Sequence, residues 1–178
     1  MPKHLRKISE ETLHENPWWK YKHDTYEKPN GQVGDYFYGE TPGGAAMIVP
    51  VLPDGKLVLT LQHRYLEDKQ SIEFPAGGLK FGQLPIDAAK GELIEETGFV
   101  ATDIVKVGVF SSLNGLFRDE CHIFIAHVIV QGEQHLDDTE EIDILYRKPE
   151  DLEEMIRNNE IWDGMTMATW SLVRHHLM

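Results

Sequence analysis

The decisive stretch of this chain runs Lys90-Gly91-Glu92-Leu93-Ile94-Glu95-Glu96-Thr97-Gly98-Phe99. In a helix with about 3.6 residues per turn, positions i, i+3 and i+4 lie on one face, so Glu92, Glu95 and Glu96 share a face. Carboxylates held side by side repel one another, and they are also the ligands that hard divalent cations such as Mg²⁺ prefer. The face is therefore either a solvated acidic surface or a metal-binding platform, and the residues around it decide between the two.

The segments around this helix predict an α+β fold, with a mixed sheet and helices packed against it. Pro85 suits the first turn of the acidic helix, and Gly98 suits the left-handed position just past its end. The turn sequence Pro53-Asp54-Gly55 between two apolar runs predicts a β-hairpin. We expect strands around Tyr36–Tyr38 and at Ala45–Leu52, Lys56–Leu61, Ile104–Phe110 and Cys121–Val130, and further helices at Pro149–Asn158 and Met165–His175.

The composition is that of a globular protein: 178 residues, of which 41% are hydrophobic and 26% charged. With 17 Lys and Arg against 30 Asp and Glu, the formal net charge is −13, which repels nucleic acid and anionic membranes. It also repels a phosphorylated substrate unless a bound cation reverses the local sign. The single cysteine, Cys121, excludes an intrachain disulfide and is expected to be a packed thiol. Because the chain shows neither a signal peptide nor a membrane-spanning apolar run, we expect a cytoplasmic protein.

The stretch from Gly77 to Phe99 resembles the signature of the Nudix hydrolases. That signature reads Gly, five residues, Glu, seven residues, Arg-Glu-hydrophobic-any-Glu-Glu-any-Gly-hydrophobic. The positions that match it here are Gly77, Glu92, Leu93, Glu95, Glu96, Gly98 and Phe99. A match of this length at fixed spacing is specific, and it favours the metal-binding interpretation of the acidic face.

Two positions depart from the signature: Gln83 stands where the family has its first Glu, and Gly91 stands where it has Arg. In the family these two charges commonly pair. Losing one partner of such a pair is costly, whereas losing both together can be nearly neutral. We therefore interpret the change as structural, because the metal-binding carboxylates remain. The contrary interpretation is a Nudix fold kept for binding alone.

The resemblance implies a mixed β-sheet sandwiched between α-helices, with residues 41–178 as the hydrolase domain. Residues 1–40 are then an N-terminal β-rich extension whose strands are used in forming a homodimer. Flanking motifs narrow the resemblance to the branch that cleaves ADP-ribose and other nucleoside diphosphate sugars. These motifs are Gln62-His63-Arg64-Tyr65, Glu73-Phe74-Pro75-Ala76-Gly77 and Leu113-Asn114-Gly115-Leu116-Phe117-Arg118-Asp119-Glu120.

The resemblance also assigns the metal site and the base. We expect Glu92 and Glu96 to be the main ligands of Mg²⁺ or Mn²⁺, with Glu95 shared or one step removed, and the backbone carbonyl of Ala76 to complete the site. Such an ion neutralises phosphate charge and lowers the pKa of a bound water. In this branch the general base is usually a Glu on a loop after the long strand. Glu140 is the first choice here, with Glu141 and Asp138 behind it; without the Nudix context this stretch would read as a solvated acidic turn.

The candidate substrate contacts are more widely spread. Arg64 suits the diphosphate, since a guanidinium grips phosphate oxygens in a bidentate way, although a surface salt bridge is the alternative. Glu73, Asn114 and Glu120 fall in the branch motifs; Glu120 matches a family position that contacts the terminal sugar, against a plain strand-edge carboxylate. Trp18 and Trp19 are suited to stacking on the base, or to packing in a dimer interface or core.

Three functions are compatible with these residues. The leading prediction is a metal-dependent hydrolase that splits a nucleoside diphosphate sugar, with ADP-ribose favoured, into a nucleoside monophosphate and a sugar phosphate. The second is a non-catalytic sensor of ADP-ribose, which the intact Glu92, Glu95 and Glu96 disfavour and the Gln83 and Gly91 departures weakly favour. The third keeps the chemistry but takes dinucleoside polyphosphates or damaged nucleoside triphosphates.

Overall fold

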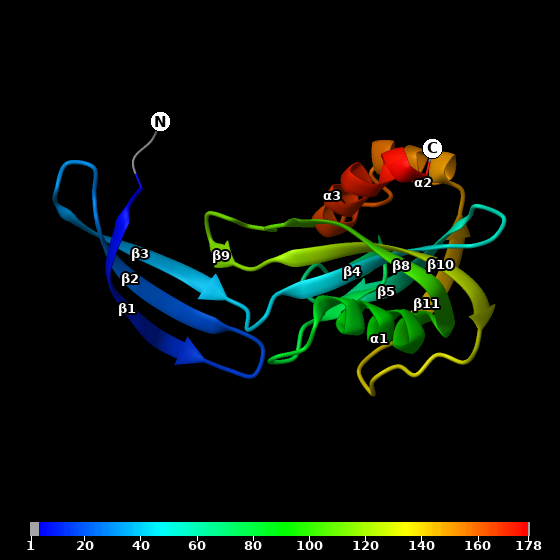
Figure 1. The fold of residues 1–178 in the computed structure, drawn as a ribbon, viewed down its shortest axis with the longest axis horizontal. Coiled ribbons are helices and arrows are strands. Elements are labelled where there is room, and N and C mark those ends of the chain that lie inside the picture. Colours follow the sequence, from blue (N-terminus) through cyan, green and yellow to red (C-terminus); the bar gives the residue numbers. More distant parts are fainter. Residues whose placement is uncertain (1–3, 178) are drawn as a thin grey trace.

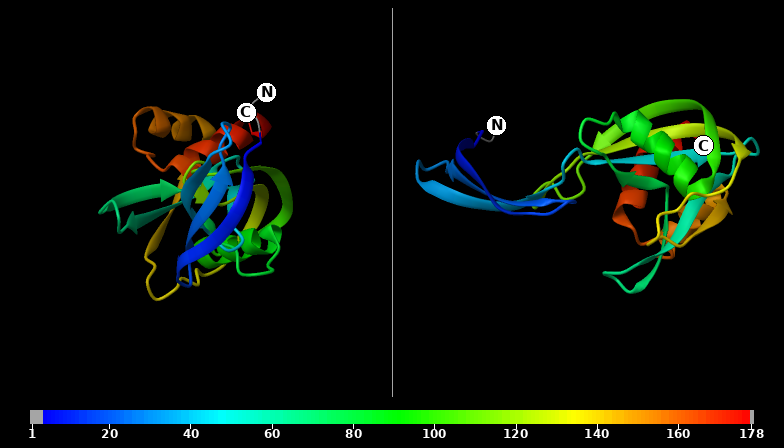
Figure 2. Two further views of the ribbon diagram at one scale, coloured as in Figure 1. Left: turned by 90° about the vertical axis from the view of Figure 1, so that its left-hand side faces the viewer. Right: turned by 90° about the horizontal axis from the view of Figure 1, so that it is seen from below.

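The computed structural model describes residues 4–177, which form two β-sheets and three α-helices (Figure 1). The first sheet has the strand order β1-β2-β3-β9 and stands beside the rest of the molecule (Figure 2). Its strands are β1 (Arg6–Glu15), β2 (Lys20–Glu27), β3 (Val33–Glu40) and β9 (Phe117–Arg118). The predicted strand around Tyr36–Tyr38 is therefore confirmed, and the N-terminal extension is rich in strands.

The second sheet has seven strands in the order β11-β5-β4-β10-β8, with β6 paired to β5 and β7 paired to β4. Its strands are β4 (Ala45–Val51), β5 (Leu57–Arg64), β6 (Lys69–Glu73), β7 (Ala76–Gly78), β8 (Phe99–Phe110), β10 (Cys121–Gln131) and β11 (Ile142–Arg147). Strands β4 and β10 run parallel while their other neighbours are antiparallel, so the sheet is mixed, as predicted.

Both faces of this sheet are covered by helices. Alternate residues of β4 point to opposite sides, so Ala46 and Ile48 pack in one core with α1 (Pro85–Thr97). Met47 and Val49 pack in a second core with α2 (Pro149–Arg157) and α3 (Gly164–Val173). Figure 1 shows α1 on one side of the sheet and α2 and α3 on the other. The predicted fold, a mixed sheet sandwiched between helices, is confirmed.

The predicted hairpin forms only at its turn. Leu52 N donates to the Lys56 carbonyl oxygen at 2.8 Å, but Val51 and Leu57 are the only paired residues of β4 and β5 within residues 4–177. Beyond that pair the strands separate, because β4 pairs with β7 and β10 while β5 pairs with β6 and β11. The opening between them admits the short strand β7, which carries residues of the candidate site.

The predicted helices are close to the observed ones. Helix α1 ends at Gly98, whose φ of 70° is the left-handed conformation that glycine adopts without strain. Its N-cap, Leu84, makes no side-chain capping bond. After α3 the chain continues as a short 3₁₀ helix over Arg174–His176. No helix in residues 4–177 combines the length and the apolar character needed to cross a membrane.

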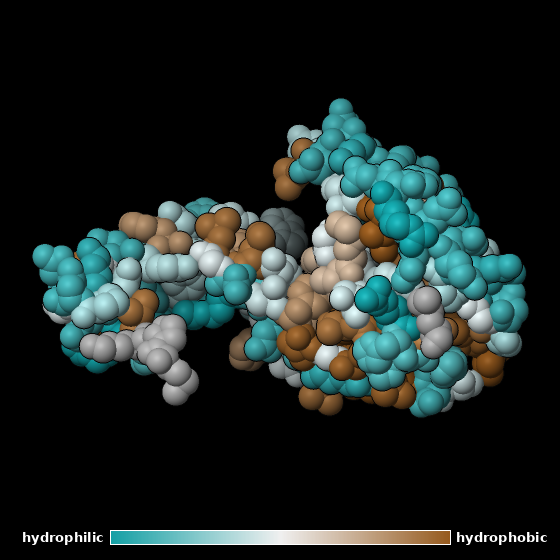
Figure 3. Space-filling model, turned by 90° about the horizontal axis from the view of Figure 1, so that it is seen from above, coloured by the Kyte–Doolittle hydropathy of each residue, from teal (hydrophilic) through white to brown (hydrophobic). Residues whose placement is uncertain are grey.

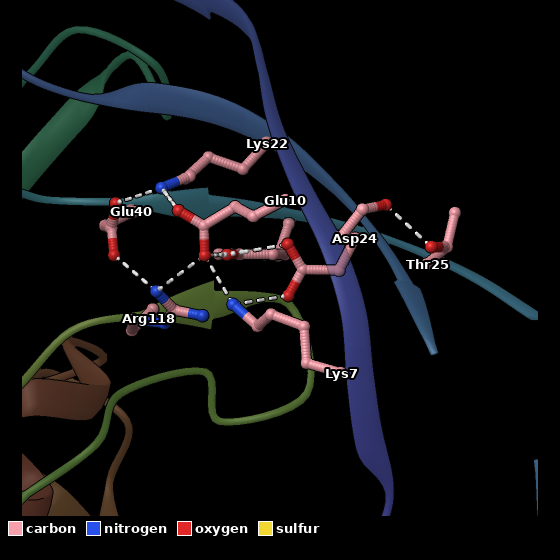
Figure 4. Close-up of polar contacts among 9 residues, drawn as sticks. Lys7, Glu10, Lys22, Asp24, Thr25, Glu40 and Arg118 are labelled. Atoms are coloured by element: carbon pink, nitrogen blue, oxygen red, sulfur yellow. Dashed lines mark hydrogen bonds and ion pairs between the residues drawn. The ribbon is translucent and has the colours of Figure 1, made fainter. Parts of the chain in front are cut away.

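Within the first sheet, a network of six charged side chains joins β1, β2 and β3 to β9 (Figure 4). Three cations, Lys7, Lys22 and Arg118, face three carboxylates, Glu10, Asp24 and Glu40. The N···O distances are 2.8 Å for Lys7–Asp24, 3.2 Å for Lys22–Glu40 and 2.7 Å for Arg118–Glu40. Lys22 and Asp24 are buried, and each has its own partners of opposite charge, Glu10 and Glu40 for Lys22 and Lys7 for Asp24, which offset the cost of desolvation. Since Arg118 belongs to the segment that leads into β10, the network joins the two sheets.

Candidate active site

The acidic helix presents two of its carboxylates to β7. The backbone N–H of Ala76 donates to Glu96 Oε2 at 3.2 Å. The Glu92 carboxylate lies so close to Gly77 that a Cβ at that position would overlap it. The signature glycine is therefore needed here for close approach. Glu96 is buried, Glu92 is half-buried and Glu95 is exposed, so the three carboxylates of the predicted helical face differ in their exposure to solvent.

The electrostatics of these carboxylates suit a divalent cation. Burial, followed by the nearby charges of Glu95 and Glu140, raises the pKa of Glu92 to about 7. Burial, followed by the charge of Glu92, raises the pKa of Glu96 to about 8. Crowded carboxylates that resist ionisation are stabilised by a cation among them, and an all-oxygen donor set fits Mg²⁺ or Mn²⁺. Within residues 4–177, no three His, Cys, Asp or Glu side chains are already gathered into a metal-binding group. The carboxylates of Glu92 and Glu96 thus have the right chemistry for the ion, but binding requires the ligands to move closer together.

These raised pKa values predict that the metal-free protein loses stability as the pH rises. The folded protein retains protons on Glu92 and Glu96 that the unfolded chain releases near the ordinary carboxyl pKa of 4.5. The stabilisation is thus complete below that value and is lost as pH rises through the folded pKa values of about 7 and 8. The melting temperature measured in a chelator should fall between about pH 5 and pH 9. Addition of Mg²⁺ should raise the melting temperature most at the alkaline end of this range.

The matched variant for that measurement is Glu96→Gln, which cannot ionise at this position. Its melting temperature should fall less than that of the wild-type protein over the same pH range. Equal slopes for the two proteins would show that Glu96 ionises normally and would contradict the assignment.

Of the two departures from the signature, Gln83 has a structural role in the described residues, whereas Gly91 has room for a side chain. Gln83 closes the loop before α1, since Gln83 Oε1 accepts from Lys80 N at 3.0 Å and Gln83 N donates to the Lys80 carbonyl oxygen at 3.0 Å. At Gly91 an added Cβ would lie 3.7 Å from Glu95 Oε1, an ordinary contact. Neither position leaves a buried charge without its partner, which agrees with the expectation that the change is structural.

Gly91 therefore weakens α1 without a packing reason within residues 4–177. We expect Gly91→Ala to raise the free energy of unfolding by about 1 kcal/mol, because alanine loses less backbone entropy in a helix. Urea unfolding followed by circular dichroism measures this change. Gly55→Ala is the contrasting variant: it also has space, but its φ of +83° strains alanine, so it should destabilise. Destabilisation by Gly91→Ala would contradict the prediction.

The loop after β10 brings Glu140 to the acidic cluster. Gln134 anchors this loop by donating to the Glu96 carbonyl oxygen at 2.6 Å and to the Ile142 carbonyl oxygen at 3.1 Å. His135 N donates to the Glu95 carbonyl oxygen at 2.8 Å. The negative charge of Glu140 contributes to the raised pKa of both Glu92 and Glu96, so Glu140 interacts electrostatically with the cluster. Its side chain accepts from Asp137 N at 3.2 Å.

Arg64 and Glu73 line a cavity on the other side of β7. The Arg64 guanidinium binds Glu73 in a bidentate way, with Nε donating to Oε1 at 2.7 Å and Nη2 donating to Oε2. The Glu73 side chain is 6% exposed and that of Arg64 is 47% exposed, so Glu73 fixes a cation that still reaches solvent. The cavity measures about 600 Å³, and Ala76, Gly77 and Trp162 also line it.

The other predicted substrate contacts lie elsewhere in the protomer. Asn114 lines a separate cavity of about 280 Å³ beside the first sheet. The Glu120 side chain is 70% exposed and lies in a third depression near Gly44. Trp18 and Trp19 are both exposed in the β1–β2 turn, and Trp19 packs against Phe117 with ring centroids 6.3 Å apart. One protomer therefore gathers six of the predicted residues, Glu92, Glu96, Glu140, Arg64, Glu73 and Ala76. Glu95 and Glu141 are exposed beside them in the sequence, and the other four, Trp18, Trp19, Asn114 and Glu120, are not brought to the site.

Several residues near the site were not among the sequence-based candidates. Asp137 adds to the charges that raise the pKa of Glu92, and Gln134 anchors the loop that carries Glu140. Trp162 and Asp163 line the cavity from the loop between α2 and α3. Asp137 belongs to the same acidic run as Glu140, so the sequence held a signal for it. Nothing local in the sequence marks Gln134, Trp162 or Asp163.

Comparison with known proteins identifies the class. The model of the NUDIX domain family matches residues 41–167, and the chain belongs to this family. The prediction of a Nudix hydrolase is thereby confirmed. Nudix hydrolases generally use divalent metal ions, in keeping with the acidic cluster.

Individual relatives narrow the comparison further. The chain is 29% identical over 142 residues to the ADP-ribose pyrophosphatase of Bacillus subtilis (strain 168), covering 79% of this chain and 76% of that protein. It is 29% identical over 150 residues to the methanol dehydrogenase activator of Bacillus methanolicus, covering 83% and 80%. A crystal structure of an ADP compounds hydrolase superimposes with a TM-score of 0.85 at 21% identity, covering 98% of this chain and 95% of that one.

Proposed function

We propose that this protein hydrolyses the pyrophosphate bond of nucleoside diphosphate sugars, with ADP-ribose as the favoured substrate and Mg²⁺ or Mn²⁺ as the cofactor. The products are a nucleoside monophosphate and a sugar phosphate. The observation that carries the proposal is the placement of Glu92 and Glu96 against β7, one strand away from the cavity of Arg64. The relationship to the Bacillus subtilis ADP-ribose pyrophosphatase supports the choice of substrate.

Each residue has a defined task in this reaction. When bound by Glu92, Glu96 and the Ala76 carbonyl, with Glu95 nearby, the cation offsets phosphate charge and acidifies water. Glu140 takes the proton as the water oxygen bonds to phosphorus, and the bridging P–O bond breaks. The electron pair of that bond leaves with the departing phosphate.

Arg64 holds the diphosphate for this attack. Glu73 occupies Nε and Nη2 of the guanidinium, which orients the cation and leaves its Nη1 edge for phosphate oxygens. Two hydrogen bonds to one fixed carboxylate limit the rotation of a long side chain. The guanidinium is therefore oriented before the substrate arrives, and less entropy is lost on binding.

We further propose a homodimer whose partner completes the substrate site. Trp18, Trp19, Asn114 and Glu120 are exposed and lie outside the cavity of Arg64 in their own protomer. The first sheet also exposes apolar side chains along β1 and the β1–β2 turn, and Figure 3 shows it as an arm beside the body, with apolar (brown) patches on a largely hydrophilic surface. An exposed edge strand with apolar side chains is a pairing surface. A second copy would cover it and carry these four residues toward the cavity.

A substrate panel tests the proposal. The protein is incubated with ADP-ribose, GDP-mannose, UDP-glucose or a dinucleoside polyphosphate, with Mg²⁺, Mn²⁺ or a chelator, and a coupled phosphatase releases phosphate from the products. We expect the fastest metal-dependent release from ADP-ribose. The absence of turnover with tight ADP-ribose binding would instead identify the non-catalytic sensor. That alternative gains weight from the relative named as an activator of a dehydrogenase. Preference for the dinucleoside polyphosphate would select the third function.

A further inference from the structure

Trp162 connects the helical layer to the hairpin that carries Arg64. Its indole Nε1 donates to the Gln70 carbonyl oxygen at 2.9 Å. The Lys69 ammonium lies over the same ring, 3.9 Å from its centroid. Both contacts fall on the first two residues of β6, so one side chain binds this strand through a hydrogen bond and a cation–π interaction.

The end of the hairpin needs such an anchor. Arg64 and Lys69 are the last cross-strand pair of β5 and β6, and the exposed turn Tyr65–Asp68 joins them. On its other edge β5 pairs with β11 only as far as Gln62, so Arg64 lies beyond the support of the main sheet. The β5–β6 hairpin projects from the body in both views of Figure 2. A cation at the free end of a two-stranded ribbon moves with that ribbon.

The anchor itself is rigid. Ile161, immediately before Trp162, is fully buried in the core beneath α2 and α3. Asp163, immediately after it, caps α3 by accepting from Thr166 N at 2.7 Å. Trp162 is thus held on both sides by fixed structure. The Asp163 carboxylate also adds to the effect of Glu73 in raising the pKa of the Arg64 guanidinium, so the same loop faces this cation.

We propose that Trp162 is a positioning residue for Arg64: it binds β6 to the loop between α2 and α3 and so fixes where the guanidinium meets the substrate diphosphate. This inference rests on the proposed function, in which Arg64 contacts the diphosphate. A displacement of about 1 Å at a contacting group costs an enzyme much of its rate, so a distant anchor has a measurable effect.

A double-mutant cycle tests the proposal. Trp162→Ala should lower kcat/KM for ADP-ribose about tenfold, through a misplaced phosphate contact. In the Arg64→Ala background, the same replacement should lower kcat/KM less than about twofold, because the group that it positions is gone. Additive losses would overturn the proposal, since they would indicate that Trp162 contacts the substrate itself or acts on the fold alone.

Milder variants keep the test valid if Trp162→Ala unfolds. Trp162→Phe keeps a ring under Lys69 but loses the N–H donor, and Lys69→Met keeps the aliphatic stem but loses the cation. Both should fall between wild type and Trp162→Ala and should be coupled to Arg64 in the same way. Lys56→Met, at the surface turn paired with Asp54, is the matched lysine control and should leave kcat/KM unchanged. Wild-type rates in both milder variants would overturn the proposal.

The same double-mutant cycle can be measured through substrate binding alone, without hydrolysis. Affinity for ADP-ribose is measured by calorimetry in a chelator for the wild-type protein, the two single variants and the double variant. If wild type binds but does not hydrolyse, the proposed enzymatic function fails, yet coupling between Trp162 and Arg64 in Kd still supports the positioning role. If wild type hydrolyses and the cycle is additive, only the positioning role fails.

Discussion

Replacement of Glu96 by glutamine is expected to abolish metal-dependent hydrolysis of ADP-ribose while the protein remains folded. Glutamine keeps the size of the side chain and retains an oxygen that can accept from Ala76 N, the bond that Glu96 makes at 3.2 Å. It loses the negative charge, and a neutral amide oxygen is a much weaker ligand for a hard divalent cation. We expect kcat to fall by at least about a hundredfold, on the scale of losing a group that stabilises transition-state charge.

The measurement is initial-rate kinetics with ADP-ribose across a range of Mg²⁺ concentrations, together with the melting temperature. Glu154→Gln, an exposed change of the same kind on α2, should leave the rate unchanged. Raising Mg²⁺ should not restore the Glu96→Gln variant, and Mg²⁺ should raise its melting temperature less than that of wild type. Wild-type turnover by a folded Glu96→Gln protein would overturn the ligand assignment.

This variant also separates function from stability. The pKa of Glu96 is raised to about 8 because burial opposes its ionisation, so a neutral side chain suits the metal-free fold better than a carboxylate does above that pH. The metal-free variant should therefore be at least as stable as wild type at alkaline pH. A buried carboxylate kept at a cost to stability is typical of a binding or catalytic group.

The acidic helical face that we propose as the metal platform could be predicted from sequence because its signals are local. The spacing of Glu92, Glu95 and Glu96 places them on one helical face, and Gly98 ends that helix in the left-handed conformation that the sequence predicts. The depth of each carboxylate could not be predicted. Glu96 is buried and Glu95 exposed because β7 contacts only part of the face, and β7 enters where β4 and β5 separate.

That separation illustrates what sequence patterns omit. Pro53-Asp54-Gly55 predicts a tight turn correctly, but strand pairing beyond the turn depends on which other strands compete for the same edges. Residues Gln134 and Trp162 were not predicted for the same reason. Each acts through a hydrogen bond to a backbone carbonyl far away in the sequence, and a backbone carbonyl leaves no mark in a residue pattern.

The strand boundaries show the same limit on a smaller scale. Strand β8 begins at Phe99, directly after the helix cap, although the apolar pattern suggests a start near Ile104. Its first half, which includes the polar residues Thr102 and Asp103, is recruited by pairing with β10. Tertiary pairing therefore overrides a weak local preference.

Glu140→Gln is expected to lower kcat for ADP-ribose by about a hundredfold to ten-thousandfold, the range for loss of a general base, with KM changed little. The carboxylate of Glu140 is close enough to Glu92 and Glu96 to raise the pKa of both, whereas Arg64, which binds the diphosphate in our proposal, lies across β7. Removing the base thus spares the substrate contacts. Steady-state kinetics with ADP-ribose, which separate kcat from KM, measure the effect.

Glu141→Gln is the matched comparison, because it changes the adjacent exposed carboxylate on the same loop. The anchors of this loop at Gln134 and His135 are unaffected by either replacement, so both variants should keep the loop in place. A large loss in Glu140→Gln with a small one in Glu141→Gln would assign the base to Glu140. If Glu140→Gln matched wild type, the base would have to be sought at Glu141 or Glu120, and the exposed position of Glu120 in its own protomer would then require the partner of a dimer to supply it.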